Sequence, residues 1–165
     1  MSRADEFLRA NQAYANDFDQ GDLPMPPQRQ VAIVACMDAR LDIYRLLGLG
    51  LGEAHVIRNA GGVVTDDVIR SLLISQRLLG TTEIVLVHHT DCGMLTFKDD
   101  AVKAEVEAET GVRPAFALDA FDDPYADVRQ SIRRLRNVPY LPRGEAISGF
   151  VYNVSTGELE PVSDK

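Results

Sequence analysis

The chain has 165 residues, of which 45% are hydrophobic and 25% are charged. It is long enough for one compact domain with a buried core, and too hydrophobic for a disordered protein. Its 25 acidic residues exceed its 17 basic residues and give a formal charge of -8, which disfavours binding to nucleic acid or to an anionic membrane. We expect a single domain over residues 1–165.

No membrane segment is expected. No apolar run approaches the roughly eighteen residues that a spanning helix needs, and the polar start of the chain carries no apolar signal-peptide region. These features predict a cytoplasmic protein. A reducing cytoplasm disfavours a structural disulfide between the two cysteines, which leaves metal binding, catalysis or simple burial as their role.

The first elements in chain order are a helix and three strands. A loosely amphipathic pattern over residues 4–18 predicts an N-terminal helix, within an arm that covers about residues 1–28. The segment GDLPMPPQRQ ends this helix. Three continuous apolar runs, each typical of a strand in a parallel sheet, then follow at residues 31–37, 54–60 and 83–89.

Helices are expected between these strands. A short one that ends in glycines separates the first two strands, and a longer one lies between the second and third strands. Thr65 can cap this longer helix and Gly80 can end it. The alternation of strands and helices predicts an α/β fold with a mostly parallel central sheet flanked by helices, and places functional groups at the carboxyl ends of the strands.

The second half of the chain is less regular. The acidic stretch over residues 98–127 predicts one short helix near residues 100–109, followed by irregular structure that includes Pro124. A helix with a basic face is expected at residues 126–137. The terminal sequence ISGFVYNVSTGELEPV then predicts a strand, a turn and a short return strand.

Three potential metal ligands stand where predicted strands end. Cys36 and Cys92 each follow an apolar run, and His89 lies three residues before Cys92. Zinc binds thiolate and imidazole groups, and a catalytic zinc takes three protein ligands and leaves a fourth position open. His88 is the alternative to His89, because neighbouring strand residues point to opposite faces and the spacing does not decide between them. Each residue alone is more often simply buried, but their joint placement predicts a zinc site.

Asp38 and Arg40 follow Cys36 at intervals of two, so in extended geometry they can lie on its side of the chain. Beside a zinc ion, Asp38 can act as a fourth ligand or as a proton acceptor, and Arg40 can hold it back from the metal. The alternative is that Asp38 caps the next helix while Arg40 makes a surface ion pair. The glycines of RNAGG (58–62) allow a tight turn or a close approach of backbone N–H groups to a small ligand.

These motifs together resemble one known enzyme family. The pattern C-x-D-x-R that begins at Cys36, then RNAGG, then H-x-x-C that begins at His89 is similar to the beta-class carbonic anhydrases. The resemblance covers roughly residues 30–97, and the short chain is similar to the small bacterial branch. Ile33 stands where some family members with an allosteric bicarbonate site have a tryptophan, which disfavours that form of regulation.

The resemblance implies a role for each matching residue. It implies Zn²⁺ held by Cys36, His89 and Cys92, and a catalytic pair formed by Asp38 and Arg40. In a closed state Asp38 would become a fourth zinc ligand. Less specific matches place Arg58 and Gly61 in the substrate pocket.

The activity implied is the reversible hydration of CO₂ to bicarbonate and a proton by hydroxide generated on zinc. The implied assembly is a homodimer or a larger even oligomer. A hydrolase of carbonyl sulfide or carbon disulfide on the same scaffold is the nearest alternative, because the same hydroxide can attack those linear molecules. A non-enzymatic zinc or redox-sensing protein is the other alternative, in which the two cysteines form a switchable thiol pair.

Overall fold

The structure is a computed structural model of the chain and describes residues 2–142 and 146–163. Within these ranges the chain forms α-helices, short 3-10 helices (η) and one β-sheet. In chain order the elements are α1 (Arg3–Asn16), β1 (Val31–Cys36), α2 (Ile43–Leu46), β2 (Ala54–Asn59), η1 (Ala60–Gly62), α3 (Asp66–Leu78), β3 (Glu83–His89), η2 (Gly93–Leu95), α4 (Asp99–Thr110), α5 (Pro124–Arg136), β4 (Ile147–Tyr152) and β5 (Leu159–Pro161).

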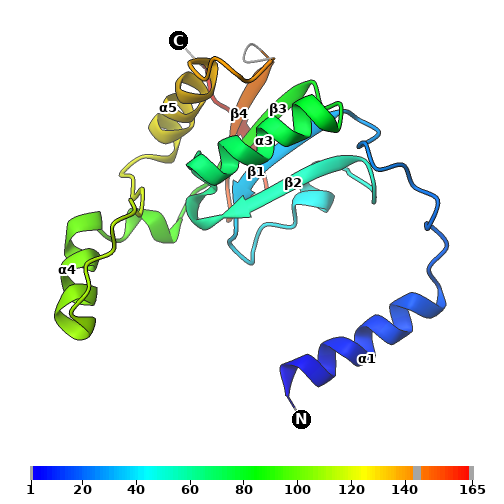
Figure 1. Cartoon of the computed structure of the whole chain (residues 1–165), viewed down its shortest axis with the longest axis horizontal. Coiled ribbons are helices and arrows are strands. Elements are labelled where there is room, and N and C mark those ends of the chain that lie inside the picture. Colours follow the sequence, from blue (N-terminus) through cyan, green and yellow to red (C-terminus); the bar gives the residue numbers. More distant parts are fainter. Residues whose placement is uncertain (1, 143–145, 164–165) are drawn as a thin grey trace.

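The strands form a five-stranded sheet in the order β2-β1-β3-β4-β5, and only β5 runs antiparallel to its neighbour (Figure 1). Ala35 of β1 pairs in register with Arg58 of β2 and with Val87 of β3. The carboxyl ends of these three strands therefore lie at the same edge of the sheet. The predicted α/β fold with a mostly parallel central sheet is confirmed.

Hydrophobic clusters lie on both faces of this sheet. Val34 of β1 belongs to the cluster that α3 and α5 cover, to which they contribute residues such as Leu72 and Ile132. Its neighbour Ile33 points to the opposite face, since strand side chains alternate, and packs there with Ile43 of α2. Long helices therefore cover one face, whereas the described residues that cover the other face belong to short helices and loops.

The helix near the C-terminus begins earlier than the sequence predicts. Pro124 was expected in irregular structure, but it is the first residue of α5. A proline is tolerated there because the first helical N–H has no partner within the helix. The Asp123 side chain accepts a hydrogen bond from the backbone N–H of Tyr125 and caps the helix. The irregular part thus ends before α5.

Two helices stand apart from the sheet. Figure 1 shows α1 beyond a long connecting segment and α4 on the opposite side of the molecule. Neither helix contains a buried residue. Phe7 and Leu8 of α1 are each 69% exposed, so the apolar side chains of the predicted N-terminal helix are not covered by the described parts of this chain.

Candidate active site

The carboxyl edge of the sheet brings the three predicted ligands together. Cys36 is the last residue of β1, His89 is the last residue of β3, and Cys92 lies in the loop that follows. The two sulfur atoms are 4.0 Å apart. Both Sγ atoms and a ring nitrogen of His89 lie within 4.8 Å of one another, and all three residues are buried. The strand ends thus create a cluster of one imidazole and two thiols.

The geometry distinguishes His89 from its neighbour His88. His89 Nδ1 is 2.8 Å from the carbonyl oxygen of Thr90, and a carbonyl can only accept, so Nδ1 carries the proton and donates it. In the neutral ring this leaves a lone pair on Nε2, which is buried and has no hydrogen-bond partner among the described residues. His88 instead places Nε2 2.7 Å from a carboxylate oxygen of Asp127 on α5.

The two cysteines strongly affect each other. The hydrogen bond from the Cys92 thiol is the main reason that the pKa of Cys36 lies below its usual range, and backbone N–H groups add to this effect. The same interaction, together with burial, raises the pKa of Cys92. Burial alone would lower the pKa of His89, but the nearby Cys36 thiolate raises it on balance. The site therefore favours one thiolate even before a metal binds.

The cluster fits a tetrahedral metal. Two thiolates that bind one zinc ion at ~2.3 Å lie roughly 3.8 Å apart at a tetrahedral angle, close to the 4.0 Å observed between Cys36 and Cys92. His89 offers a buried nitrogen without another partner, and its Nδ1 is fixed by a backbone carbonyl, as is usual for a metal-binding histidine. The donor set and its spacing thus suit zinc.

Asp38 and Arg40 form a fork beside this cluster. Arg40 donates from Nε to Asp38 Oδ1 at 3.0 Å and from Nη2 to Asp38 Oδ2 at 2.8 Å. These bonds hold the pKa of Asp38 far below its usual range, so the group is a carboxylate at neutral pH. Its Oδ2 lies 3.8 Å from His89 Nε2. The alternative role in helix capping belongs instead to Asp42, whose side chain accepts from the N–H of Arg45.

Known proteins are similar in sequence to this chain over almost its whole length. A family model described as carbonic anhydrase matches residues 31–159. Beta-carbonic anhydrase 1 of Mycobacterium tuberculosis is 58% identical over 163 residues, which cover 99% of each chain. The chain belongs to the beta-class carbonic anhydrase family. The predicted family and enzyme class are confirmed.

A solved relative extends the similarity to the fold. The crystal structure of the carbonic anhydrase from Streptococcus mutans matches with a TM-score of 0.92 and 46% identity over 99% of both chains. A carbon disulfide hydrolase of Acidithiobacillus thiooxidans is 35% identical over 158 residues, which cover 83% of this chain and 79% of that protein. The carbon disulfide hydrolase is therefore a more distant relative than the mycobacterial and streptococcal carbonic anhydrases.

Arg58 contacts the backbone of the segment that carries Cys36 and Asp38. It donates from Nε and Nη2 to the carbonyl oxygen of Cys36, and from Nη2 to that of Asp38 at 2.7 Å. These bonds fix the backbone that carries both side chains. In the structure Arg58 braces the end of β1, and its predicted place in a substrate pocket stays a prediction.

Gly61 lies against the same cluster with a positive φ of 79°. A Cβ atom there would be 2.9 Å from Met94 Cγ and 3.2 Å from Phe121 Cε1, so only glycine fits without a shift. Its N–H also helps to lower the pKa of Cys36. The RNAGG turn thus places backbone, instead of a side chain, against the site.

Sequence reasoning missed two residues inside the H-x-x-C motif. Thr90 receives the hydrogen bond from His89, and Asp91 accepts hydrogen bonds from Arg40. Both occupy the variable positions of the motif, and a motif that fixes only its first and last residues gives no signal for them. Their position between two predicted ligands was the only available indication.

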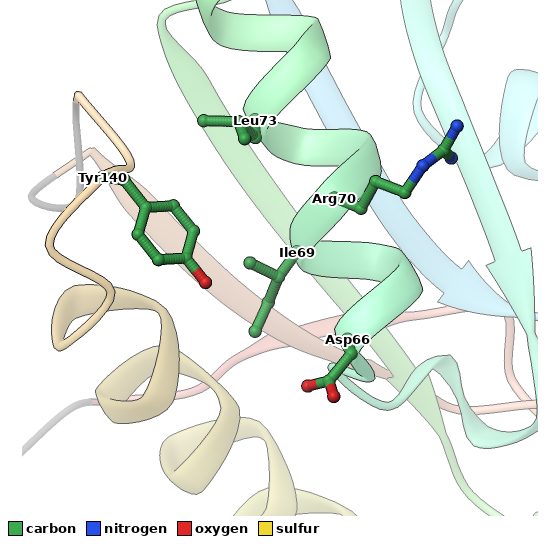
Figure 2. A pocket seen from close by; sticks show the side chains of 5 residues that line it. All are labelled: Asp66, Ile69, Arg70, Leu73 and Tyr140. Atoms are coloured by element: carbon green, nitrogen blue, oxygen red, sulfur yellow. The ribbon is translucent and has the colours of Figure 1, made fainter.

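A separate hollow of about 370 Å³ lies between α3 and the segment before β4 (Figure 2). In Figure 2 Tyr140 faces Ile69 and Leu73 of α3, while Asp66 and Arg70 lie on the same helix. The hollow is mainly apolar, and its lining residues include none of the cysteine or histidine residues of the carboxyl edge.

None of the described helices is long and apolar enough to cross a membrane.

Proposed function

We propose that the chain catalyses the reversible hydration of CO₂ to bicarbonate and a proton, with Zn²⁺ held by Cys36, His89 and Cys92. The observation that carries this proposal is the buried Cys-His-Cys cluster beside a carboxylate that Arg40 holds in place. When bound, zinc would supply the Lewis acidity that brings the pKa of a water molecule toward ~7, so that a nucleophile for CO₂ exists at neutral pH.

Asp38 orients the attacking water. Because its pKa is held so low, its carboxylate accepts hydrogen bonds at neutral pH but is a weak base. With Oδ2 3.8 Å from His89 Nε2, it lies where a water molecule at the site can donate to it. Positioning the nucleophile is thus its main contribution, and the proton leaves by another route.

Arg40 keeps Asp38 available for this task. Its fork occupies both carboxylate oxygens, which opposes a closed state in which Asp38 would itself become a fourth ligand. Carboxylate ligation would exclude the substrate water, so loss of the fork favours an idle site. Asp38 and Arg40 together act as a gate on the fourth position.

The surroundings suit a small uncharged substrate. Gly61 has Val63, Met94 and Phe121 as its nearest side chains, and apolar walls of this kind hold a linear molecule without a charge. We place Gly61 in this wall, and we place Arg58 of β2 at the edge of the same pocket, where it holds the backbone at the end of β1. Linear sulfur analogues of CO₂ have the same shape, so the wall alone does not select between them.

We propose a homodimer or a larger even assembly in which α1 packs on a partner. The apolar side chains of α1 are exposed, and one face of the sheet keeps partly buried residues such as Val56 and Val85. Obligate dimers cover such apolar surface. Sedimentation of a Phe7→Ser, Leu8→Ser variant should show a smaller species than the wild type, and a wild-type monomer with full activity would rule the assembly out.

We also propose a cytoplasmic location. Cys36 and Cys92 must remain reduced to bind a metal, and their sulfur atoms are only 4.0 Å apart. A reducing compartment keeps such a pair available as ligands. Fractionation of the producing cells, with activity followed in each fraction, tests this location.

The deciding experiment compares substrates. The metal-loaded protein is assayed by stopped flow for CO₂ hydration, and in parallel for sulfide release from carbonyl sulfide and carbon disulfide. We expect CO₂ hydration to have the higher kcat/KM. Faster sulfide release would assign the chain to the hydrolases instead, and no activity on any of the three would favour a zinc or redox-sensing role.

A further inference from the structure

Asp91 contacts Arg40 with both its side chain and its backbone. Arg40 donates from Nη1 to Asp91 Oδ2 at 2.7 Å and from Nη2 to the Asp91 carbonyl oxygen at 2.9 Å. Asp91 lies in the loop after β3, whereas Arg40 follows β1. The contact therefore joins the two loops that carry the site.

The guanidinium is thereby held on two sides. A guanidinium has five N–H donors in one plane, and the described bonds of Arg40 to Asp38 and Asp91 occupy four of them. The Arg40 side chain is 48% exposed, so burial does little to restrain it. Its orientation depends on these two acidic partners.

Asp91 is itself held by its neighbours. The N–H of Thr90 donates to the carbonyl of Tyr152 at 2.9 Å, and Thr90 Oγ1 accepts from the N–H of Val154 at 3.1 Å. Asp91 has a φ of 54°, a left-handed conformation that aspartate tolerates better than most residues. The loop is thus a fixed support and not a flexible contact.

We propose that Asp91 is a positioning residue that holds the Arg40 guanidinium in the plane in which it grips Asp38. The effect on catalysis rests on the proposed function, because it passes through the Asp38–Arg40 gate. The alternative is an ordinary surface ion pair, since the Asp91 side chain is 78% exposed and exposed pairs are often worth little. The backbone contact and the anchored loop favour the positioning role.

The test compares two aspartates with the same backbone conformation. Asp91→Gly removes the carboxylate and tolerates the positive φ. Asp119→Gly is the control, because Asp119 has a φ of 59° and its backbone N–H, which glycine keeps, bonds to Asp99 instead of Arg40. We expect Asp91→Gly to lower kcat for CO₂ hydration about two- to fivefold, the range for an exposed charge pair, with unchanged KM and metal content. Asp91→Asn should retain most activity, because its amide oxygen can still accept from Nη1. Asp119→Gly should match the wild type.

Two further measurements separate positioning from a general loss of structure. In ¹⁵N-labelled protein, the side-chain N–H signals of Arg40 are identified by their absence in Arg40→Ala. The Nη1 group should rotate slowly in the wild type and faster in Asp91→Gly, because that variant loses the bond from Nη1 to Asp91 Oδ2 while the bonds from Nε and Nη2 remain. Adding Asp91→Gly to Arg40→Ala should cause no further loss of kcat. Unchanged Arg40 signals, or an equal loss of kcat in the Arg40→Ala background, would overturn the proposal. The spectra test the contact even if CO₂ hydration is not the activity.

Discussion

The two faces of the sheet at the end of β3 use the same residue type in opposite ways. His88 and His89 are adjacent and both are fully buried. Each has one ring nitrogen in a hydrogen bond, and each has another without a partner among the described residues. Strand alternation sends His89 toward two thiols and His88 toward Asp127 and the ring of Phe121.

The difference shows that burial does not by itself indicate a ligand. A ring nitrogen without a partner is found on both faces, but only His89 lies with sulfur atoms at metal-binding distances. His88 instead ties β3 to α5 through Asp127. We therefore expect substitutions on the His89 face to affect metal binding and activity, and substitutions on the His88 face to affect stability.

The largest expected effect is on metal content. Cys36→Ala, His89→Ala and Cys92→Ala should each lose most of the zinc, because only two of the three ligands remain. His88→Ala should retain about one zinc per chain at a lower stability. Metal analysis of the purified proteins measures this, with circular dichroism to identify variants that do not fold, since metal binding and folding are coupled. Zinc lost from His88→Ala but kept by His89→Ala would reverse the assignment.

The next effect concerns the chemistry of the His89 face. Arg40→Ala should bind zinc normally but lose up to about a hundredfold in kcat, because the carboxylate of Asp38 is no longer held in position. Asp38→Ala should also keep its zinc but lose the group that orients water. Stopped-flow assays with metal analysis test both. Wild-type activity in Arg40→Ala would reduce the fork to an ion pair without a role in catalysis.

A smaller effect is expected on the His88 face. Asp127→Ala removes the acceptor for the buried Nε2–H of His88, which should lower the free energy of unfolding by about 1–3 kcal/mol. Zinc content should not change. Asp67→Ala is a matched control, because Asp67 also lies in the first turn of a helix but is exposed. Urea unfolding of the metal-loaded proteins compares the two. Equal losses of unfolding free energy in the two variants would mean that the contact with His88 contributes nothing beyond the general effect of an acidic residue in the first turn of a helix.

Much of this comparison was accessible from the sequence. The strand that ends in two histidines was predicted with the observed bounds, because its apolar run is continuous and sharply limited. The site residues were expected at one edge because parallel strands share their carboxyl ends. The choice between His88 and His89 could not be made from alternation, which separates the two residues without saying which face holds Cys36. It needed either the family resemblance or the three-dimensional structure.

Contacts between loops that are distant in the chain could not be predicted from the sequence. Asp91 meets Arg40 across 51 positions, and the left-handed turn that allows this has no pattern of its own. The early start of α5 was missed because a proline was treated as a helix breaker, although at the first position it is compatible with a helix. Local patterns therefore predicted the elements, while the partners of exposed charges depended on the tertiary fold.

The smallest expected effect concerns the carboxylate of Asp99, which holds the segment before Phe121. The Phe121 ring lies near residues of both faces of the sheet. Asp99 accepts hydrogen bonds from the N–H groups of Leu118, Asp119 and Ala120, and so fixes the segment that leads to this ring. The Phe121 centroid is 5.4 Å from that of His88, and the same ring lies beside Gly61. Asp99→Asn should cost roughly 1 kcal/mol, because an amide offers one oxygen and no charge.

The pH dependence of this cost identifies its cause. The N–H groups, that of Ala120 most of all, lower the pKa of Asp99 below its ordinary value of 3.8. A carboxylate with a lowered pKa in the folded state stabilises the fold above its ordinary pKa, and this contribution is lost as the pH falls through the folded-state value. The difference in unfolding free energy between wild type and Asp99→Asn should thus be constant near neutral pH and shrink below pH 3.8.

Comparing the two proteins at each pH cancels the acid sensitivity of the metal site, which they share. A difference that stays constant into the acid range would show that the charge of Asp99 does not matter, and that the amide replaces it fully as an acceptor.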